Sequence, residues 1–332
     1  MAPGTRRSTD KLPSRRAPVA ARAKAPAGIR PLFHEGEHAV QRRAGTEQVA
    51  AQIGRNIAPF VPAEFGEFLI RQPFVVVASR DQAGSIWASL ITGKPGFARA
   101  LNDRQVLLAG LPASPDPLED ALEQPEAQIG LLAIELDTRQ RIRLNGTAQR
   151  TDEGLALTVS EAFGNCTKYI QRRLPAGRLT EPGGARLHQS AALDPRHASV
   201  VRAADTFFIA SAHPERGADA SHRGGRPGFI EVDASGRRLT FPDYSGNRMF
   251  QTLGNLTVDP RTGLLLIDWE TGSTLQLSGR ARIVWDAEEL RSRPGAERLI
   301  EFTVDAVREC QRAMPTTWRL VEPYQRNPLV NS

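Results

Sequence analysis

The sequence predicts a mainly β protein with a few helices, built as two small antiparallel barrels in tandem. Three observations lead to this prediction. The chain of 332 residues is too long for one ordinary small core, so two domains are the default expectation. The chain repeats itself along its length. Within each repeat, short β-type segments follow one another closely, which favours a small antiparallel barrel over a doubly wound parallel sheet.

The repeat is visible as matched segments at an almost constant separation. Ala78-Ser79 recurs as Ala210-Ser211, and GKPGF at 93–97 recurs as GRPGF, in both cases 132 positions later. GLLAIELDTRQRIRLNGTA at 130–148 lies over GLLLIDWETGSTLQLSGRA at a separation of 133. The separation grows from 132 to 133 positions, and a one-residue insertion in a loop explains this change. We therefore interpret the repeat as an internal duplication.

Each half has the same predicted order of elements. A β-branched run leads into a Gly/Pro turn, a second strand follows, and a short third strand comes next. A helical segment is clear in the second half, where Met249, Leu253 and Leu256 recur at i, i+4 and i+7. A hairpin follows, and we expect each half to close with a helix or a strand and a helix. The predicted first strands with their turns are 74–84 and 207–217, and the predicted third strands are 106–111 and 238–241. The second-half hairpin is 264–269 with 274–284, and the closing segments are 155–173 and 299–313.

Segments outside the repeat set the domain boundaries. Residues 1–30 are rich in Ala, Pro and Arg and are expected to form a disordered basic tail. Residues 31–180 are expected to form the first barrel, with a helical lead-in at 31–72 that packs on it. Residues 190–325 form the second barrel, and the Pro/Gly-rich stretch 175–185 is the predicted linker.

The charge of the chain lies in the tail. Residues 1–30 contain eight basic residues and one acid, a charge of +7, so the rest of a chain with net charge +6 sums to −1. Scattered cations without interleaved aromatics are a poor nucleic-acid signature, although a weak polyanion-binding arm stays open. No apolar run approaches the ~20 residues that cross a bilayer. Cys166 and Cys310 are far apart and lack a CxxC partner, which disfavours disulfide and zinc sites and points to a reducing cytoplasm.

Two clusters in the second half indicate an anion site. In the first, Ser221, His222 and Arg223 precede glycines, which let backbone N–H groups approach a ligand closely. In the second, FPDYSGNR at 241–248 opens the helical segment, and a helix N-terminus favours an anion. Arg is the preferred bidentate partner of phosphate. The alternative is that both clusters are ordinary solvent-exposed turns that bind no ligand.

With these motifs the sequence resembles the pyridoxamine 5′-phosphate oxidase-like, FMN-binding split-barrel superfamily, and more closely its predicted flavin-nucleotide-binding proteins. The resemblance covers roughly 33–325 and also includes FHEGE at 33–37 and GNCTKYIQRR at 164–173. It implies two tandem split β-barrels that form a pseudo-dimer. It also implies roles for particular residues: Arg223, Asn247 and Arg248 on the FMN phosphate, and Pro242 and Asp243 on the isoalloxazine ring.

Two departures put the substrate in doubt. The oxidases proper carry a different pair at the positions of Pro242 and Asp243, and Trp318-Arg319 is not spaced like their C-terminal Trp…Arg segment. Pyridoxamine phosphate oxidase activity is therefore not assigned.

The two halves have lost opposite parts of the family's site. The first half reads SLITG at 89–93 where the second reads SHRGG, so it lacks the His and the Arg. The second half ends ECQRAM at 309–314, without the Lys and the Tyr of 164–173. This complementary loss predicts one working FMN site shared between the halves, while drift in two independent barrels stays open. The predicted cofactor-binding residues are Ser221, His222, Arg223, Gly224, Pro242, Asp243, Asn247, Arg248, Lys168, Tyr169 and Arg172.

The resemblance makes an FMN-dependent oxidoreductase with an unknown substrate the leading interpretation, since the cofactor supplies the redox chemistry. Lys168, Tyr169 and His222 are candidates for polarising the flavin or donating a proton; no catalytic residue or metal ligand is assigned. The alternative is a non-catalytic flavin carrier or a haem-handling split barrel. The expected partners are a small-molecule substrate or electron donor, without nucleic acid or membrane. The chain is expected to be either a monomer with an internal pseudo-dimer or a homodimer.

Overall fold

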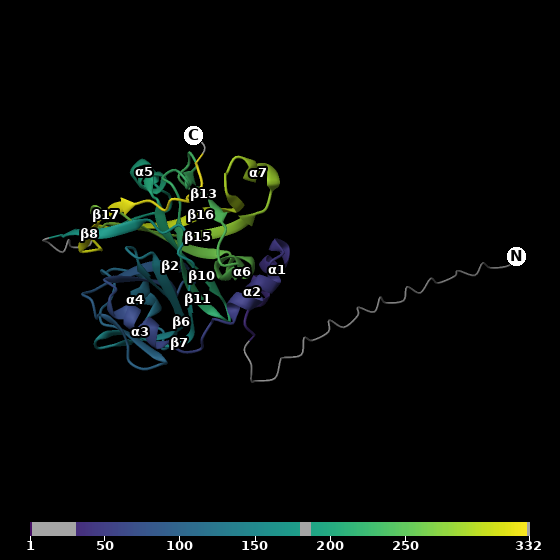
Figure 1. Cartoon of the computed structure of the whole chain (residues 1–332). Helices are drawn as coiled ribbons and strands as arrows, with labels where there is room; N and C mark the ends of the chain where they lie inside the picture. Colours follow the sequence, from purple (N-terminus) through teal and green to yellow (C-terminus); the bar gives the residue numbers. More distant parts are fainter. Residues whose placement is uncertain (2–30, 180–186, 331–332) are drawn as a thin grey trace. The chain divides into compact units, whose positions relative to one another are not determined.

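Antiparallel strands dominate the part of the chain that the computed structural model describes, which is residue 1 and residues 31–179 and 187–330 (Figure 1). These residues include seven helices, and from Leu32 onward they belong to one unit. The mainly β prediction is confirmed. Apart from its first residue, the predicted tail at 1–30 lies outside the described residues.

The first sheet has the strand order β2-β1-β5-β6-β7-β4-β3, and its neighbouring strands pair antiparallel. Its strands are β1 (Phe74–Arg80), β2 (Ile86–Thr92), β3 (Ala98–Ala100), β4 (Gln105–Leu108), β5 (Ala127–Glu135), β6 (Gln140–Thr151) and β7 (Gly154–Gly164).

The second sheet has the order β11-β10-β14-β15-β16-β13-β12, with β9 paired to β16 off this path. Replacing every strand of the first sheet by the strand nine places later gives the same order, so the halves share one topology. The strands are β9 (Leu187–Ser190), β10 (Thr206–His213), β11 (Gly217–Gly224), β12 (Glu231–Val232), β13 (Arg238–Tyr244), β14 (Arg261–Ile267), β15 (Thr274–Val284) and β16 (Ala296–Cys310).

Matched glycines have matched structural roles in the two halves. A Cβ on Gly146 would lie 1.9 Å from the carbonyl oxygen of Thr158, and one on Gly279 would lie 1.9 Å from that of Thr303. Both glycines sit at a register shift, between β6 and β7 and between β15 and β16. A bulge where two backbones nearly touch requires glycine. This accounts for the recurrence of glycine at these positions of the repeat.

A shared core joins the two sheets. Both β1 and β10 bury side chains on both faces: one face lies in the core of its own sheet, and the other packs between the sheets. Strands buried on both faces read as continuous apolar runs, which is why FVVVAS and FFIAS lack alternation. Glycine permits the close crossing of the sheets, because a Cβ on Gly130 of β5 would lie 2.5 Å from Cα of Asp219 in β11.

The structure corrects the prediction for the segment that closes each half. The segments 155–173 and 299–313 were expected to contain helix, but β7 and β16 are long strands. Leu155, Leu157 and Val159 alternate with more exposed positions, and this period of two is typical of a strand. The predicted helix after the third strand is present as α6 (Gln251–Val258), which begins two residues after Met249.

The predicted linker is partly a strand. β8 (Arg172–Arg178) pairs with β17 (Thr316–Glu322) in a separate two-stranded sheet, and residues 180–186 lie outside the described ranges. Pro175 removes one backbone donor, which a two-stranded ribbon tolerates because each strand has an unpaired edge.

The helical lead-in packs on both sheets, not on the first alone. Phe68 and Leu69 of α3 lie in the first core, as expected, but Val40 of α1 lies in the second core and α1 packs against α6. None of the described helices is long and apolar enough to cross a membrane. The remaining helices are α1 (Glu35–Ala44), α2 (Glu47–Gly54), α3 (Ala63–Ile70), α4 (Pro117–Ala121), α5 (Pro195–Ala203) and α7 (Ala287–Arg291).

Candidate anion-binding pocket

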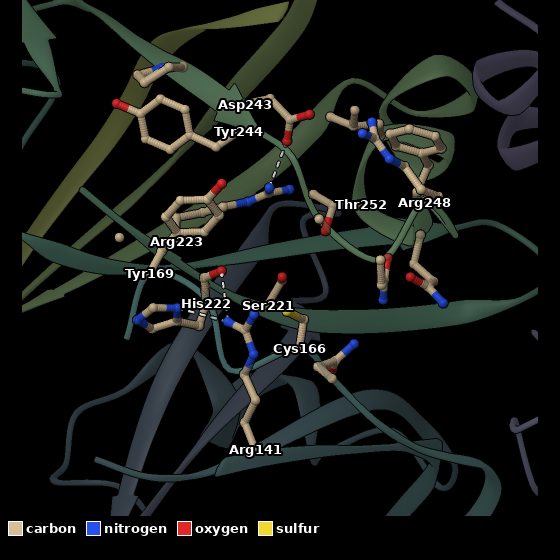
Figure 2. A pocket seen from close by; sticks show the side chains of 18 of the residues that line it. Arg141, Cys166, Tyr169, Ser221, His222, Arg223, Asp243, Tyr244, Arg248 and Thr252 are labelled. Carbon is tan, nitrogen blue, oxygen red and sulfur yellow. Dashed lines mark hydrogen bonds and ion pairs between the residues drawn. The ribbon is translucent and has the colours of Figure 1, made fainter. Parts of the chain in front are cut away.

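One pocket brings together most of the residues singled out in the sequence (Figure 2). It contains about 730 Å³ of empty space, part of it open to solvent. Nine of the eleven predicted residues line it: Tyr169, Ser221, His222, Arg223, Gly224, Pro242, Asp243, Asn247 and Arg248.

Lys168 and Arg172 do not line the pocket. Arg172 forms an ion pair with Asp137 at 2.7 Å on the surface. Lys168 is half-buried on the loop beside Tyr169. The backbone of Tyr169 has φ of 65°. Two successive side chains therefore leave this loop differently, and only Tyr169 reaches the pocket.

Strand β11 and the segment after β13 supply the second-half wall. Arg223 donates to Asp243 at 2.6 Å, and Arg298, almost fully buried behind the pocket, donates to the other oxygen of Asp243 at 2.9 Å. Arg248, with φ of 65°, donates to Glu297 at 2.5 Å. Arg298 also contacts Glu297, so three guanidiniums share two carboxylates.

The first turn of α6 lies at the same wall. Gln251, Thr252 and Leu253 line the pocket, and the N-cap residue Phe250 provides no side-chain cap. Its φ of 63° is unusual for a non-glycine residue. The first backbone N–H groups of a helix have no partner within the helix, so an uncapped first turn at a pocket favours an anion there.

Sequence reasoning missed the first-half arginines. Arg141 and Arg143 project from β6 into the pocket, while Ile142 and Leu144, which alternate with them, lie in the first core. Arg143 donates to both oxygens of Asp219 at 3.0 and 3.1 Å and to Ser221 at 2.7 Å. The alternation of RIRLN at 141–145 was the available signal.

Arg141 has no carboxylate partner among the described residues. Its Nη1 donates to Nδ1 of His222 at 2.8 Å (Figure 2). Burial, followed by the neighbouring guanidinium of Arg143, lowers the pKa of Arg141 to about 9, which leaves it charged at neutral pH. Burial and the charge of Arg141 lower the pKa of His222 well below its usual value, so the imidazole is neutral.

The cluster as a whole is cationic. Its five guanidiniums face three carboxylates, a formal excess of two positive charges in the arginines and acids Arg141, Arg143, Arg223, Arg248, Arg298, Asp219, Asp243 and Glu297. Buried polar atoms without a described partner include Nε of Arg223, Nε2 of His222 and both amide atoms of Asn165. Buried excess charge is costly unless a counter-charge binds. The pocket therefore suits an anion.

Aromatic rings close one side of the pocket. Tyr169 packs on Tyr244 with ring centroids 5.2 Å apart and donates its hydroxyl to the carbonyl oxygen of Ser245 at 3.2 Å. Burial raises the pKa of Tyr169 to about 12, so the phenol stays protonated. A Cβ on Gly224 would lie 2.0 Å from the carbonyl oxygen of Tyr169, which explains why glycine ends β11.

At the position that the internal repeat relates to the pocket, the polar side chains form hydrogen bonds with one another. Gln276 takes the place of Arg143, and Ser89 takes the place of Ser221. The hydroxyl of Ser89 donates to Asp116 at 2.5 Å, and Gln276 donates to the same carboxylate at 3.0 Å. These polar groups satisfy one another, so this position has no comparable excess of positive charge.

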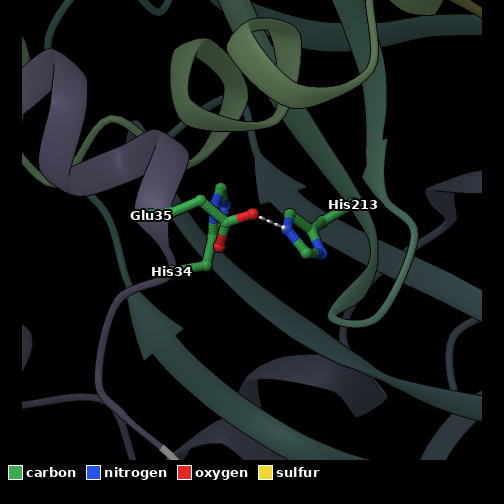
Figure 3. Close-up of side chains that lie close together, drawn as sticks. All are labelled: His34, Glu35 and His213. Atoms are coloured by element: carbon green, nitrogen blue, oxygen red, sulfur yellow. Dashed lines mark hydrogen bonds and ion pairs between the residues drawn. The ribbon is translucent and has the colours of Figure 1, made fainter. Parts of the chain in front are cut away.

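A second cluster, away from the pocket, joins α1 to β10 (Figure 3). His34, Glu35 and His213 offer ligand atoms within 4.8 Å of one another. Backbone N–H groups donate to Nδ1 of His34, from Gly36 at 3.1 Å, and to Nδ1 of His213, from Glu215 at 3.0 Å. In the neutral rings each Nε2 therefore carries the hydrogen.

This tautomer argues against a metal at the cluster. A metal-binding histidine coordinates through its unprotonated nitrogen and donates its other N–H to an acceptor. Here Nε2 of His34 faces Asn255 Oδ1 at 3.0 Å and Nε2 of His213 faces Glu35 at 3.2 Å. The cluster therefore connects α1, β10 and α6 through hydrogen bonds.

The family model that matches this chain covers part of its second half. Residues 193–318 match the family model described as pyridoxamine 5′-phosphate oxidase. No curated protein matches.

Three of the solved structures that are similar to part of this chain have the following values. HupZ of Group A Streptococcus is 10% identical with a TM-score of 0.28, covering 38% of this chain and 98% of its own. A putative pyridoxamine 5′-phosphate oxidase of Lactobacillus delbrueckii is 10% identical with a TM-score of 0.30, covering 36% and 94%. The FAD binding protein of Mycobacterium smegmatis is 12% identical with a TM-score of 0.27, covering 37% and 99%.

Proposed function

We propose that the pocket holds FMN and that the protein is an FMN-dependent oxidoreductase, in line with the match of residues 193–318 to the pyridoxamine 5′-phosphate oxidase family model. The observation that supports this most strongly is the excess of two positive charges in the pocket cluster. A phosphate monoester carries about −1.5 to −2 charges at neutral pH, which matches that excess.

The residues present fit the phosphate of FMN. Arg223 and Arg248 are the proposed phosphate ligands, because guanidinium groups form charge-assisted hydrogen bonds with phosphate oxygens. Asn247 and the uncapped first turn of α6 would add neutral donors. Neither arginine is free of carboxylate, so the phosphate would compete with Asp243 and Glu297 for them. The matching charge excess makes this exchange favourable.

A bound flavin would supply hydride or electron transfer. The chain's own residues bind and orient it. His222 is neutral and buried, and Tyr169 stays protonated with its hydroxyl committed to Ser245, so neither is poised to release a proton at neutral pH. Their proposed roles are therefore in packing and hydrogen bonding.

We further propose that the chain is a duplicated pair of split barrels acting as its own dimer, with one FMN per chain. The shared strand order and the matched bulge glycines support the duplication. Arg141 and Arg143 come from the first half and Arg223 and Arg248 from the second, so both halves contribute to the pocket. The corresponding position around Asp116 is satisfied internally.

Purified protein tests the proposal directly. We expect a flavin absorption spectrum, release of FMN and not FAD on denaturation, and one FMN per chain by native mass spectrometry. Bleaching of the flavin by a reductant such as NAD(P)H distinguishes an enzyme from a carrier, and a Soret band would indicate haem. A colourless protein that fails to bind added FMN would refute flavin binding. Two FMN per chain would refute the shared site.

A further inference from the structure

We propose that His222 is a positioning residue: a neutral acceptor that holds the guanidinium of Arg141 in place without cancelling its charge, so that this charge serves the phosphate of FMN. The inference rests on the proposed function, because it assigns a role within the same pocket. It names the residue pair through which the first half contributes charge to a phosphate site in the second.

Four arginines line the pocket, and they are held in two different ways. Arg143, Arg223 and Arg248 each contact a carboxylate. Arg141 alone, among the described lining residues, is held by an imidazole nitrogen, at 2.8 Å, with the backbone carbonyl of His222 at 3.4 Å. Both of these acceptors are uncharged, so Arg141 keeps its full charge.

The hydrogen-bond chemistry fixes the state of the imidazole. A guanidinium can only donate, so Nδ1 of His222 must present its lone pair to Arg141. A doubly protonated ring has no lone pair and would repel the guanidinium. Burial and the surrounding arginines also lower the pKa of His222, in agreement with the geometry. Arg141 therefore keeps His222 neutral, and His222 keeps Arg141 oriented.

The other half shows this pair replaced at both positions. The residue that corresponds to Arg141 is Thr274, and the residue that corresponds to His222 is Leu90. Leu90 packs in the core between the sheets. The half that lacks the arginine therefore also lacks the histidine, as expected if the function of His222 is to hold Arg141.

Two nearly isosteric substitutions separate charge from shape. Asn and Asp both place an oxygen near the position of Nδ1, and they differ chiefly in charge. His222→Asn supplies a neutral acceptor, whereas His222→Asp supplies a carboxylate that would neutralise Arg141. Arg141→Ala removes the cation. Dissociation constants of FMN and of riboflavin, which lacks the phosphate, are measured by fluorescence titration for each variant, with circular dichroism and thermal melting to check the fold.

We expect His222→Asn to bind FMN within about threefold of the wild type. His222→Asp and Arg141→Ala should each weaken FMN binding by ~10- to 100-fold, the usual loss of a charge-assisted hydrogen bond, with riboflavin affinity nearly unchanged. Wild-type affinity in His222→Asp would overturn the inference while leaving the flavin site intact. Equal weakening in the Asn and Asp variants, or equal losses for riboflavin and FMN, would also overturn it.

A readout without flavin keeps the two proposals distinguishable. Nitrogen-15 NMR of the flavin-free protein should show His222 as the neutral Nε2–H tautomer throughout the range from about pH 6 to 8. A ring that titrates in this range would refute the positioning role even if FMN binds. Failure of the wild type to bind either flavin would instead refute the proposed function, and with it the assignment to phosphate.

Discussion

Replacing Glu37 by Gln should stabilise the protein, and increasingly so as the pH rises. Glu37 lies in the first turn of α1, is 5% exposed, and accepts a hydrogen bond from the backbone N–H of His34 at 2.8 Å. Burial, with a smaller contribution from the negative charge of Glu161, raises its pKa to about 8. Glutamine keeps the same acceptor but carries no charge.

The size of the effect follows from the pKa. Each unit of pKa shift corresponds to ~1.4 kcal/mol, so a rise from 4.5 to about 8 sets an upper limit of ~5 kcal/mol at pH 8 and above. Relaxation around a buried charge reduces such costs, and we expect ~2–4 kcal/mol. The folded pKa lies above the unfolded one. The contribution of Glu37 to stability is therefore complete below about pH 4.5 and is lost as the pH rises through about 8.

Urea denaturation of the wild type and Glu37→Gln near pH 5, 7 and 8.5 measures this difference. The two proteins should be nearly equally stable near pH 5, and the variant should gain as the pH rises. Glu35→Gln is the matched control in the same helical turn. A hydrogen bond from its own backbone N–H, aided by the one from His213, lowers the pKa of Glu35, so this variant should show no alkaline gain. A difference between wild type and Glu37→Gln that stays constant across the range would refute the reasoning.

Two further predictions concern the pocket itself. Arg223→Ala and Arg248→Ala should each weaken FMN binding by roughly 1.5–3 kcal/mol in a fluorescence titration; unchanged affinity in both would place the phosphate elsewhere. Gly224→Ala should lower stability by ~2 kcal/mol or more and reduce the flavin content, because its Cβ would meet the backbone oxygen of Tyr169 at 2.0 Å. The control Gly164→Ala, where a Cβ meets nothing within 4 Å, should change neither, and a wild-type melting temperature for Gly224→Ala would contradict the predicted clash.

The sequence was most informative where the pocket is built from contiguous residues. Ser221 to Gly224 and the segment from Pro242 to Arg248 each form a short motif on one strand or turn, and the structure brings both to one pocket. Within a motif, spacing along the chain fixes spacing in the fold. The roles proposed for these residues, by contrast, stay predictions until a ligand is measured.

The sequence was least informative where a contact joins the two halves. Arg141 and Arg143 alternate with core residues, which marks a half-exposed strand, but alternation does not say which surface the polar face meets. Only the crossing of β11 over β5 and β6 places them opposite Asp219 and Ser221. Lys168 was expected in the pocket with Tyr169 but does not line it, for a related reason: the left-handed turn at Tyr169 is invisible in the residue types.

The shared strand order of the two halves distinguishes residues that the backbone requires from residues that differ between the two facing surfaces. The matched bulge glycines, Gly146 and Gly279, remain because in both halves a side chain would collide with the neighbouring strand. Side chains on the facing surface of the same strands are under no such constraint. In the first half they are Arg141 and Arg143, and in the second Thr274 is one of their counterparts. The two halves therefore keep one strand order although their facing side chains differ in charge, because the pairing of the strands does not depend on these side chains.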